Sequence, residues 1–381
     1  MQLNPILEAM GDYPLAELQL RARSLREAGR PLIDFSIGDP REPTPEFIRE
    51  ALRLAIPEVS QYPTTIGLAE LRQAISAYLR RRFEVEVDPD AQIIPTTGSK
   101  EGIFHTPFAF VAPGSGQSVV YGTPGYPVYE RGAQFAGARL DPVTLSGDFV
   151  LRASDIPDEV WDRARLVWSC SPHNPAGSVT SQDEMLALVE RSRAEGALFL
   201  SDECYADVYE GEPPGSVLQA AGSDPAGTLA FFSCSKRSGM TGYRSGAIVG
   251  DAEAISALVA LRSSVGVAPA EFVQAAAVAA WSDDEHAAQR RALFAAKRAV
   301  LRAAFERLSL EVVGSNAGLY LWIAVDDDVA VTGRLLERGV VVSPGRAFGR
   351  GGEGYIRLAL VPTLEECEQA VEVLVECLSD D

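Results

Sequence analysis

The chain has 381 residues and carries 53 acidic against 34 basic residues, a formal net charge of −19. The length exceeds that of most single domains, and the charge argues against nucleic acid or an anionic membrane as a partner. Five cysteines without a C-x-x-C pair indicate neither a zinc site nor a redox motif. The charged N-terminal segment and the shortness of the apolar stretches argue against a signal peptide and a membrane span, so a soluble cytoplasmic protein is expected.

The spacing of apolar residues predicts two structural regions. From about residue 67 to residue 262, short apolar strands alternate with helical segments, which is typical of a mostly parallel α/β sheet. After residue 270 the pattern predicts a second, smaller α+β region. Its expected elements are helices at 271–281 and 284–308, strands at 310–313 and 318–323, a further helix, a strand around Arg357 and a closing helix at 364–378.

A glycine turn follows the predicted strand 92–95. Gly98-Ser99-Lys100 opens a predicted helix here, and the free backbone N–H groups of a helix start bind phosphate well. A glycine turn before a helix is common, so this segment alone is a weak signal. Pro107 is expected to bend the helix or to confine it to about its first two turns.

Three further polar segments follow predicted strands. Tyr126 lies in a turn made rigid by proline, where its ring can stack on a planar heterocycle. Asn174 lies between two prolines and is placed to donate a hydrogen bond from its amide. Asp202 and Glu203 end an apolar strand, where a carboxylate is costly without a cationic partner. A protonated ring nitrogen would supply that partner, and Tyr205 would then bond a ring hydroxyl.

Lys236 is the central candidate for chemistry. It ends the run Ser233-Cys234-Ser235-Lys236 after a predicted buried strand at 228–232, and Arg244 follows in a glycine-containing loop. Hydroxyls and a guanidinium hold a phosphate dianion, and a lysine of depressed pKa forms a Schiff base with an aldehyde. The pattern therefore suits an aldehyde cofactor that carries a phosphate, although a lysine in such a loop is more often a solvated surface residue.

Taken in order, these segments resemble pyridoxal-phosphate (PLP) aminotransferases of the fold type I, class I/II superfamily. The matching residues run over nearly the whole length, and they are Gly38, Tyr62, Gly98-Ser99-Lys100, Tyr126, Asn174 to Gly177, Asp202, Tyr205, Ser233 to Lys236, Arg244 and Arg357. The resemblance implies a large domain with a mostly parallel seven-stranded sheet and a smaller α+β domain. It assigns residues 1–40 to a segment that packs with the small domain, residues 41–270 to the large PLP-binding domain and residues 271–381 to the small domain.

The resemblance also implies the roles of these residues. Lys236 would bind the PLP aldehyde and then move a proton, and Asp202 would keep the ring nitrogen protonated. Asn174 and Tyr205 would bond the phenolic oxygen, and Tyr126 would stack on the ring. The phosphate would be bound by Gly98, Ser99, Lys100, Ser233 and Arg244, with Tyr62 reaching in from the partner subunit of a homodimer that shares its active sites.

Arg357 would hold the substrate α-carboxylate with a bidentate fork, helped by Gly38 and Asn174. This role is again implied by the resemblance. An arginine on an alternating strand otherwise points to solvent more often than not.

Four phrases resemble N-succinyldiaminopimelate aminotransferases in particular, at residues 36–45, 62–67, 201–205 and 235–238. This resemblance implies N-succinyl-LL-diaminopimelate as the amino donor and 2-oxoglutarate with glutamate as the second pair, in lysine and diaminopimelate biosynthesis. An aspartate, aromatic or broad-range aminotransferase is the alternative. PLP-dependent β-lyase or oxidase chemistry on the same fold is a further one.

The distal carboxylates of such a donor call for additional cations at the mouth of the pocket. The candidates, each close in sequence to a site motif, are Arg41, Lys100, Arg237 and Arg346. At least two of the four are expected to be ordinary surface charges.

Overall fold

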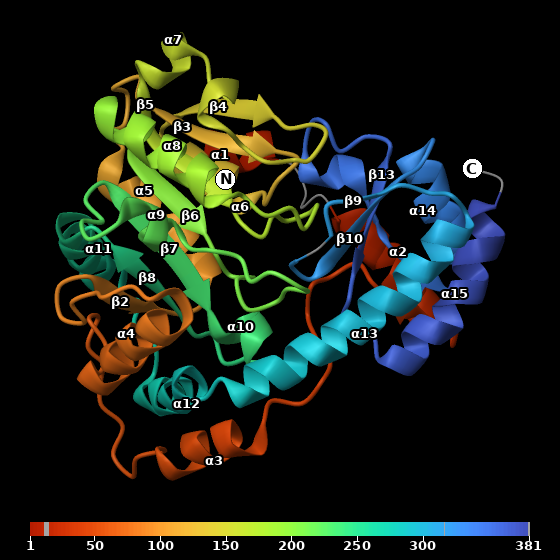
Figure 1. Cartoon of the computed structure of the whole chain (residues 1–381), viewed down its shortest axis with the longest axis horizontal. Coiled ribbons are helices and arrows are strands. Elements are labelled where there is room, and N and C mark those ends of the chain that lie inside the picture. Colours follow the sequence, from red (N-terminus) through yellow and green to blue (C-terminus); the bar gives the residue numbers. More distant parts are fainter. Residues whose placement is uncertain (11–14, 316, 380–381) are drawn as a thin grey trace.

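The computed structural model describes residues 1–10, 15–315 and 317–379. A seven-stranded sheet organises the larger part of the molecule (Figure 1). Its strands, in spatial order, are β2 (Ile93–Thr96), β8 (Gly246–Gly250), β7 (Thr228–Ser233), β6 (Leu198–Asp202), β5 (Ala164–Cys170), β3 (Ser118–Thr123) and β4 (Arg139–Thr144). β8 runs antiparallel to both of its neighbours, and the remaining pairs are parallel. The predicted mostly parallel seven-stranded sheet is confirmed.

Both faces of this sheet are buried, which explains why its strands read as nearly continuous apolar runs. In β7, Leu229 and Phe231 belong to one apolar cluster, whereas Ala230 and Phe232 belong to another. Successive side chains on a strand point to opposite faces, so each cluster covers one face. The helices of this part are α3 (Glu46–Leu54), α4 (Ala69–Phe83), α5 (Ser99–Phe110), α6 (Val128–Phe135), α7 (Asp158–Trp161), α8 (Gln182–Ala194), α9 (Val217–Ala221), α10 (Cys234–Arg237), α11 (Ala252–Val265) and α12 (Glu271–Ser282), with the 3-10 turn η1 (Ala153–Asp155).

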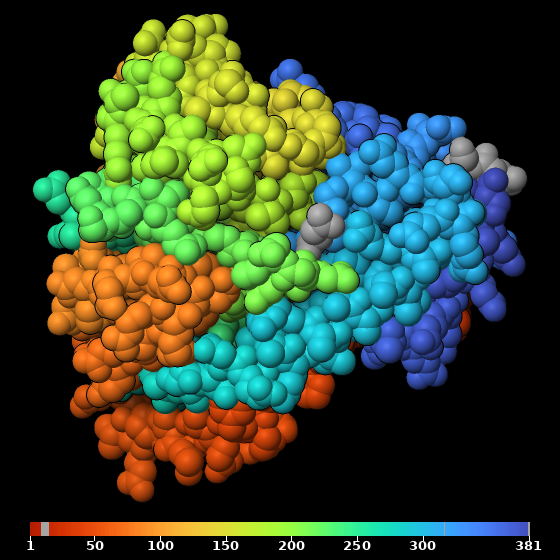
Figure 2. Space-filling model, viewed as in Figure 1, coloured from red at the N-terminus to blue at the C-terminus, as the bar shows by residue number. Residues whose placement is uncertain are grey.

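A four-stranded antiparallel sheet forms the C-terminal part. Its strands, in spatial order, are β12 (Ser343–Pro344), β13 (Tyr355–Ala359), β10 (Tyr320–Ala324) and β9 (Val312–Val313). Around it lie the helices α13 (Glu285–Arg307), α14 (Asp328–Glu337) and α15 (Leu364–Leu378), and the 3-10 turn η2 (Gly345–Phe348). In Figure 2, α13 crosses the surface from the part with the large sheet to the part with the small one.

The N-terminal segment packs mostly with the C-terminal part. The helix α2 (Ala16–Glu27) places Ala22 against Leu336 and Val341, and β1 (Ile33–Asp34) pairs in parallel with β11 (Val340–Val341). Figure 1 shows these red elements among the blue ones. The helix α1 (Pro5–Met10) lies instead against α6, on the side of the large sheet. The domain boundaries at residues 41 and 271 stay a prediction.

Most predicted helices lie within a few residues of their expected bounds, and the expectation that Pro107 confines its helix to about two turns was wrong. α5 continues through Pro107 to Phe110, because proline removes only one N–H while its own carbonyl accepts a bond from the Val111 N–H at 2.9 Å. Lys236 lies in the one-turn helix α10, directly after β7, at the strand end where the sequence placed it. No helix in the described ranges is long and apolar enough to cross a membrane.

Candidate active site

A cavity of about 280 Å³ lies where three parallel strands end. Asp202 ends β6, Ser233 ends β7, and Asn174 follows β5. Ligands bind in open α/β sheets at this carboxyl edge of the strands. The lining residues are Gln19, Ile37, Gly38, Ser99, Lys100, Tyr126, Asn174, Asp202, Cys204, Tyr205, Ser233, Ser235, Lys236, Arg244, Tyr320 and Arg357. The structure therefore brings together every predicted site residue except Gly98 and Tyr62.

Cationic side chains, hydroxyl groups and the N-terminus of α5 line one side of the cavity. α5 begins at Ser99 directly after Gly98, whose φ of 83° favours glycine. A side chain at Gly98 would collide with the Arg244 guanidinium, so this glycine lets the arginine approach the helix start. Burial, and then the neighbouring Arg244 and Arg131, lowers the pKa of Lys100. This concentration of positive charge and N–H groups favours a phosphate dianion.

Asp202 supplies the opposite charge. Its side chain is buried, it accepts a hydrogen bond from the Tyr129 hydroxyl at 2.7 Å, and its other oxygen accepts one from the Cys204 N–H at 3.3 Å. Burial raises the pKa of the Asp202 carboxyl. Within the described ranges no cation pairs with Asp202, and a carboxylate at such a position is costly unless a ligand provides the positive charge.

Lys236 reaches across the cavity from α10. The Ser233 hydroxyl caps this helix by accepting a bond from the Ser235 N–H at 3.1 Å, and the lysine Nζ donates to the Gly38 carbonyl. Burial lowers the pKa of Lys236 from 10.5 to about 8. The surface alternative for this lysine is wrong. The sequence holds three lysines, Lys100, Lys236 and Lys297, and Lys297 is ion-paired with Glu42.

Arg357 is buried, not solvent-facing. Its guanidinium donates to the Asn174 side-chain oxygen at 2.9 Å and to the Ser36 carbonyl at 2.6 Å. The rings of Tyr320 and Phe348 lie 4.2 Å and 4.3 Å from its guanidinium carbon, so it is held between two aromatic faces. Because the Asn174 carbonyl accepts from Arg357, its amide N–H₂ group is left to donate to a ligand.

Two tyrosines of the site were not predicted from the sequence. Tyr129 is the donor to Asp202, and it lies in α6, three residues after Tyr126. The Tyr320 hydroxyl lies 3.0 Å from that of Tyr205, and a side chain at Gly38 would collide with it. Tyr129 is close to Tyr126 in the sequence, whereas Tyr320 comes from β10 of the other sheet and only folding brings it to the site.

Three of the four candidate cations lie outside this cavity. Arg237 is 3% exposed and bonded to the buried Asp207 at 2.6 Å. Arg41 is paired with Glu366 at 2.8 Å, and Arg346 with Asp328 at 2.7 Å. Lys100 alone among the four candidates lines the cavity. Tyr62 is fully exposed in the single chain and does not line it either.

The comparison with known families decides the class. Residues 30–374 match the family model of aminotransferase class I and II. The chain belongs to this family. Members of the family use PLP, so this aminotransferase is a PLP-dependent enzyme, as the sequence predicted.

Similar proteins cover nearly the whole aminotransferase chain. The LL-diaminopimelate aminotransferase of Aquifex aeolicus is 35% identical over 96% of both chains. The 4-dedimethylamino-4-oxo-anhydrotetracycline transaminase of Streptomyces rimosus is 37% identical over 91% of this chain and 94% of its own. A solved structure described as a probable N-succinyldiaminopimelate aminotransferase from Thermus thermophilus has a TM-score of 0.89 at 27% identity, covering 96% of this chain and 100% of its own.

The residues of the cavity fit PLP chemically. The cofactor carries an aldehyde, a phosphate and a basic ring nitrogen. The cavity offers a buried amine of lowered pKa, a cationic helix start with hydroxyls, and a buried carboxylate that lacks a cationic partner in the described part of the chain. Each group of the cofactor therefore meets a complementary group.

Proposed function

We propose that this aminotransferase takes a diaminopimelate as its amino donor, with 2-oxoglutarate and glutamate as the second pair, in lysine and diaminopimelate biosynthesis. The observation that carries the proposal is the 35% identity, over 96% of the chain, with a relative named LL-diaminopimelate aminotransferase. Further relatives of that name are 32% to 34% identical. They favour the free LL-diamino acid over the N-succinylated form that the sequence predicted.

The succinylated donor remains the competing substrate. Its support is the set of four sequence phrases and the similarity to the Thermus structure, at 27% identity. An aspartate activity has support of the same size, because a solved aspartate aminotransferase of Thermus thermophilus is 27% identical with a TM-score of 0.91. A half-reaction separates these possibilities because it needs only one substrate at a time.

We assign the chemistry to the residues around Lys236. Bound PLP supplies an aldehyde for the amine and a ring that withdraws electrons from the donor. Lys236 would hold the cofactor, and its lowered pKa would suit it to move a proton from the donor α-carbon near neutral pH. Asp202 would hold a proton on the ring nitrogen. Asn174 and Tyr205 would donate to the phenolic oxygen, and Tyr126 would pack on the ring.

The remaining residues bind the two anionic ends. Gly98, Ser99, Lys100, Ser233 and Arg244 bind the phosphate. Arg357 binds the α-carboxylate of the donor, and the rings on both of its faces orient the guanidinium for a bidentate contact. The Gly38 backbone lies beside it in the cavity.

A homodimer would complete the site. Large apolar side chains are exposed on and after α3, namely Leu54, Ile56, Val59, Tyr62 and Ile66. Contiguous exposed apolar surface marks protein–protein contacts, so we assign this segment to the subunit interface, with Tyr62 entering the partner's cavity. The cytoplasmic location expected from the sequence stays a prediction.

The test is a panel of half-reactions. Cofactor-loaded enzyme is mixed separately with LL-diaminopimelate, its N-succinyl derivative, glutamate, aspartate and phenylalanine, and the conversion of the bound cofactor to its amino form is followed by absorbance. We expect the highest rate constants with LL-diaminopimelate and glutamate. A preference for the succinylated donor would return the function to that predicted from the sequence, and a preference for aspartate or phenylalanine would refute the proposal.

A further inference from the structure

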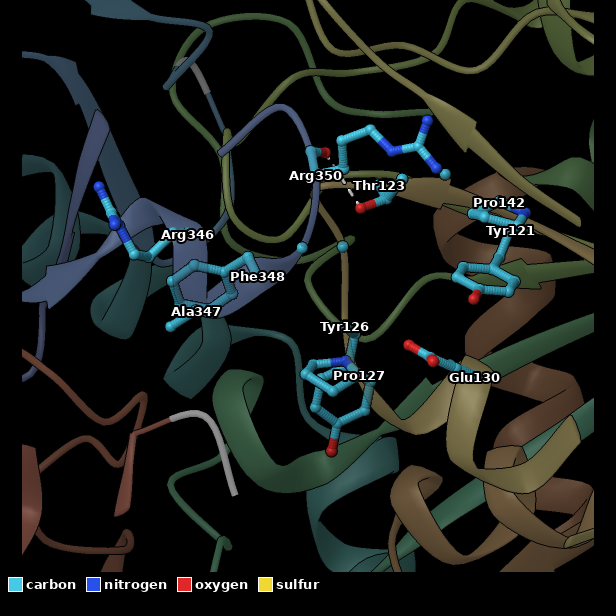
Figure 3. Close-up of a pocket in the computed structure, with 13 residues that line it drawn as sticks. Tyr121, Thr123, Tyr126, Pro127, Glu130, Pro142, Arg346, Ala347, Phe348 and Arg350 are labelled. Carbon is cyan, nitrogen blue, oxygen red and sulfur yellow. Dashed lines mark hydrogen bonds between the residues drawn. The ribbon is translucent and has the colours of Figure 1, made fainter. Parts of the chain in front are cut away.

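A second cavity, of about 300 Å³, adjoins the active site. It lies between the turn that leads from β3 into α6 and the loop around η2 (Figure 3). Its lining residues are Tyr121, Gly122, Thr123, Gly125, Tyr126, Pro127, Glu130, Pro142, Arg346, Ala347, Phe348, Gly349 and Arg350. None of the roles assigned above uses this space, which is large enough for the end of a small ligand.

Two aromatic rings connect the second cavity to the active site. Tyr126 lines both cavities. Phe348 lines the second cavity and also covers one face of the Arg357 guanidinium at 4.3 Å. A donor whose α-carboxylate is bound by Arg357 therefore lies beside two rings that also line the second cavity.

The walls of the second cavity are fixed to each other. The Gly125 N–H donates to the Phe348 carbonyl at 2.8 Å, and the Thr123 hydroxyl donates to the Arg350 carbonyl at 3.1 Å. A side chain at Gly349 would collide with the Thr123 hydroxyl, so the close approach of the two loops depends on this glycine. The cavity is therefore preformed, which lowers the entropy cost of binding.

The cavity presents one available charge of each sign. Glu130 accepts a bond from the Gln134 amide at 3.2 Å, and its second oxygen has no hydrogen bond within the described ranges. In the same part of the chain the Arg350 guanidinium has no ion pair. Figure 3 shows Arg350 along the upper rim and Glu130 on the opposite side, while the Arg346 side chain, paired with Asp328, points away.

Tyr121 lies between these two charges in Figure 3. Burial, and then the nearby carboxylates of Glu130 and Asp141, raises the pKa of the Tyr121 hydroxyl. The hydroxyl therefore stays protonated and is available as a donor to a carboxylate.

We propose that the second cavity binds the far end of the amino donor, and that this end carries an ammonium and a carboxylate on one carbon. Glu130 accepts from the ammonium, and Arg350 with the Tyr121 hydroxyl binds the carboxylate. The inference rests on the proposed function and deepens it, because it makes the unacylated diamino diacid the preferred donor. Acylation of the distal amine would remove the charge that Glu130 recognises, and glutamate has no such group.

The test compares Glu130→Gln and Arg350→Gln with wild type in half-reactions with LL-diaminopimelate, N-succinyl-LL-diaminopimelate and glutamate. A charge-assisted hydrogen bond is worth about tenfold to a hundredfold in kcat/KM. We expect Glu130→Gln to lower kcat/KM for LL-diaminopimelate by at least about tenfold more than that for glutamate, and to shrink the preference for the free over the succinylated donor by a similar factor. Arg350→Gln should also slow LL-diaminopimelate selectively. The exposed Glu159→Gln is the matched control.

Three outcomes would overturn the inference. Equal losses with all donors would mean that Glu130 and Arg350 only support Tyr126. Losses no larger than those of Glu159→Gln would mean that the cavity takes no part in donor binding. A wild-type enzyme that does not convert with LL-diaminopimelate would refute the proposed function and this inference with it, whereas either of the first two outcomes would refute the inference alone.

Discussion

Arg237→Met removes the cation of a buried ion pair that follows Lys236 in the chain. Arg237 donates to Asp207 at 2.6 Å and to the Ala280 carbonyl at 2.6 Å, and the Tyr78 hydroxyl donates to Asp207 at 2.9 Å. The Arg237 and Asp207 side chains are 3% and 4% exposed. Methionine has a similar length and fills the space, so the main effect is a buried carboxylate left with Arg82, at 3.2 Å, as its remaining cationic partner.

The size of the effect follows from this geometry. Removing one partner of a buried pair costs about 3–5 kcal/mol, and the retained Arg82 places the expected cost at about 3 kcal/mol. An unfolding entropy of about 2.1 cal/mol/K per residue gives about 0.8 kcal/mol/K for 381 residues, so the Tm should fall by about 4 °C. Thermal unfolding followed by circular dichroism measures this shift.

Arg53→Met is the matched control. Arg53 is 53% exposed and pairs with Glu46 at 2.7 Å and Glu50 at 3.0 Å. Exposed pairs contribute at most about 1 kcal/mol, so the Tm of this variant should stay within about 1 °C of wild type. If Arg237→Met and Arg53→Met shift the Tm equally, the reasoning about burial is refuted.

Three further predictions concern the site. Asp202→Asn should retain bound PLP and lose at least about a hundredfold in kcat, because an amide cannot keep the PLP ring nitrogen protonated. Cofactor absorbance and kcat measure the two effects. Near-normal turnover would contradict the prediction. In the cofactor-free protein, burial lowers the pKa of Lys236 from 10.5 to about 8, so this lysine loses its proton at a lower pH in the folded state than in the unfolded chain. The stability of the wild-type protein relative to Lys236→Met, measured as the difference in urea midpoint, should therefore rise between about pH 8 and pH 10.5. A difference that stays constant over this range would refute the prediction. Mixing Tyr62→Phe with Lys236→Ala chains should restore activity by forming one intact shared site, and a monomer in sedimentation would remove the basis for this prediction.

The central residues of the site could be predicted from the sequence because short segments of the chain determine where they lie. Lys236 and Asp202 each lie at or just after the end of a strand whose apolar run is visible in the sequence. Parallel strands end at the same edge of the sheet, so the polar residues at their ends come together even where no other contact is predicted. The predicted closing helix at 364–378 is confirmed for the same reason, because Thr363 caps it and its apolar spacing is regular.

The rest depends on contacts between segments far apart in the chain. Arg237 was a candidate for binding the substrate because it follows Lys236. In the structure its guanidinium instead donates to Asp207 and to the carbonyl of Ala280 in α12. Tyr320 and Phe348 enclose Arg357 from β10 and η2, and no spacing in the sequence indicates either contact. The burial of Arg357 itself reverses the usual expectation for an arginine on an alternating strand.

The assignment of Lys236 as the residue that holds the cofactor is the central claim, and the chain makes it directly testable. Borohydride reduction of the PLP-loaded enzyme fixes the cofactor on the amine that holds it, and peptide mass spectrometry then locates the modified residue among Lys100, Lys236, Lys297 and the N-terminus. We expect modification of Lys236 at close to one cofactor per chain. Modification of Lys100 or Lys297 instead, with Lys236 unmodified, would contradict it.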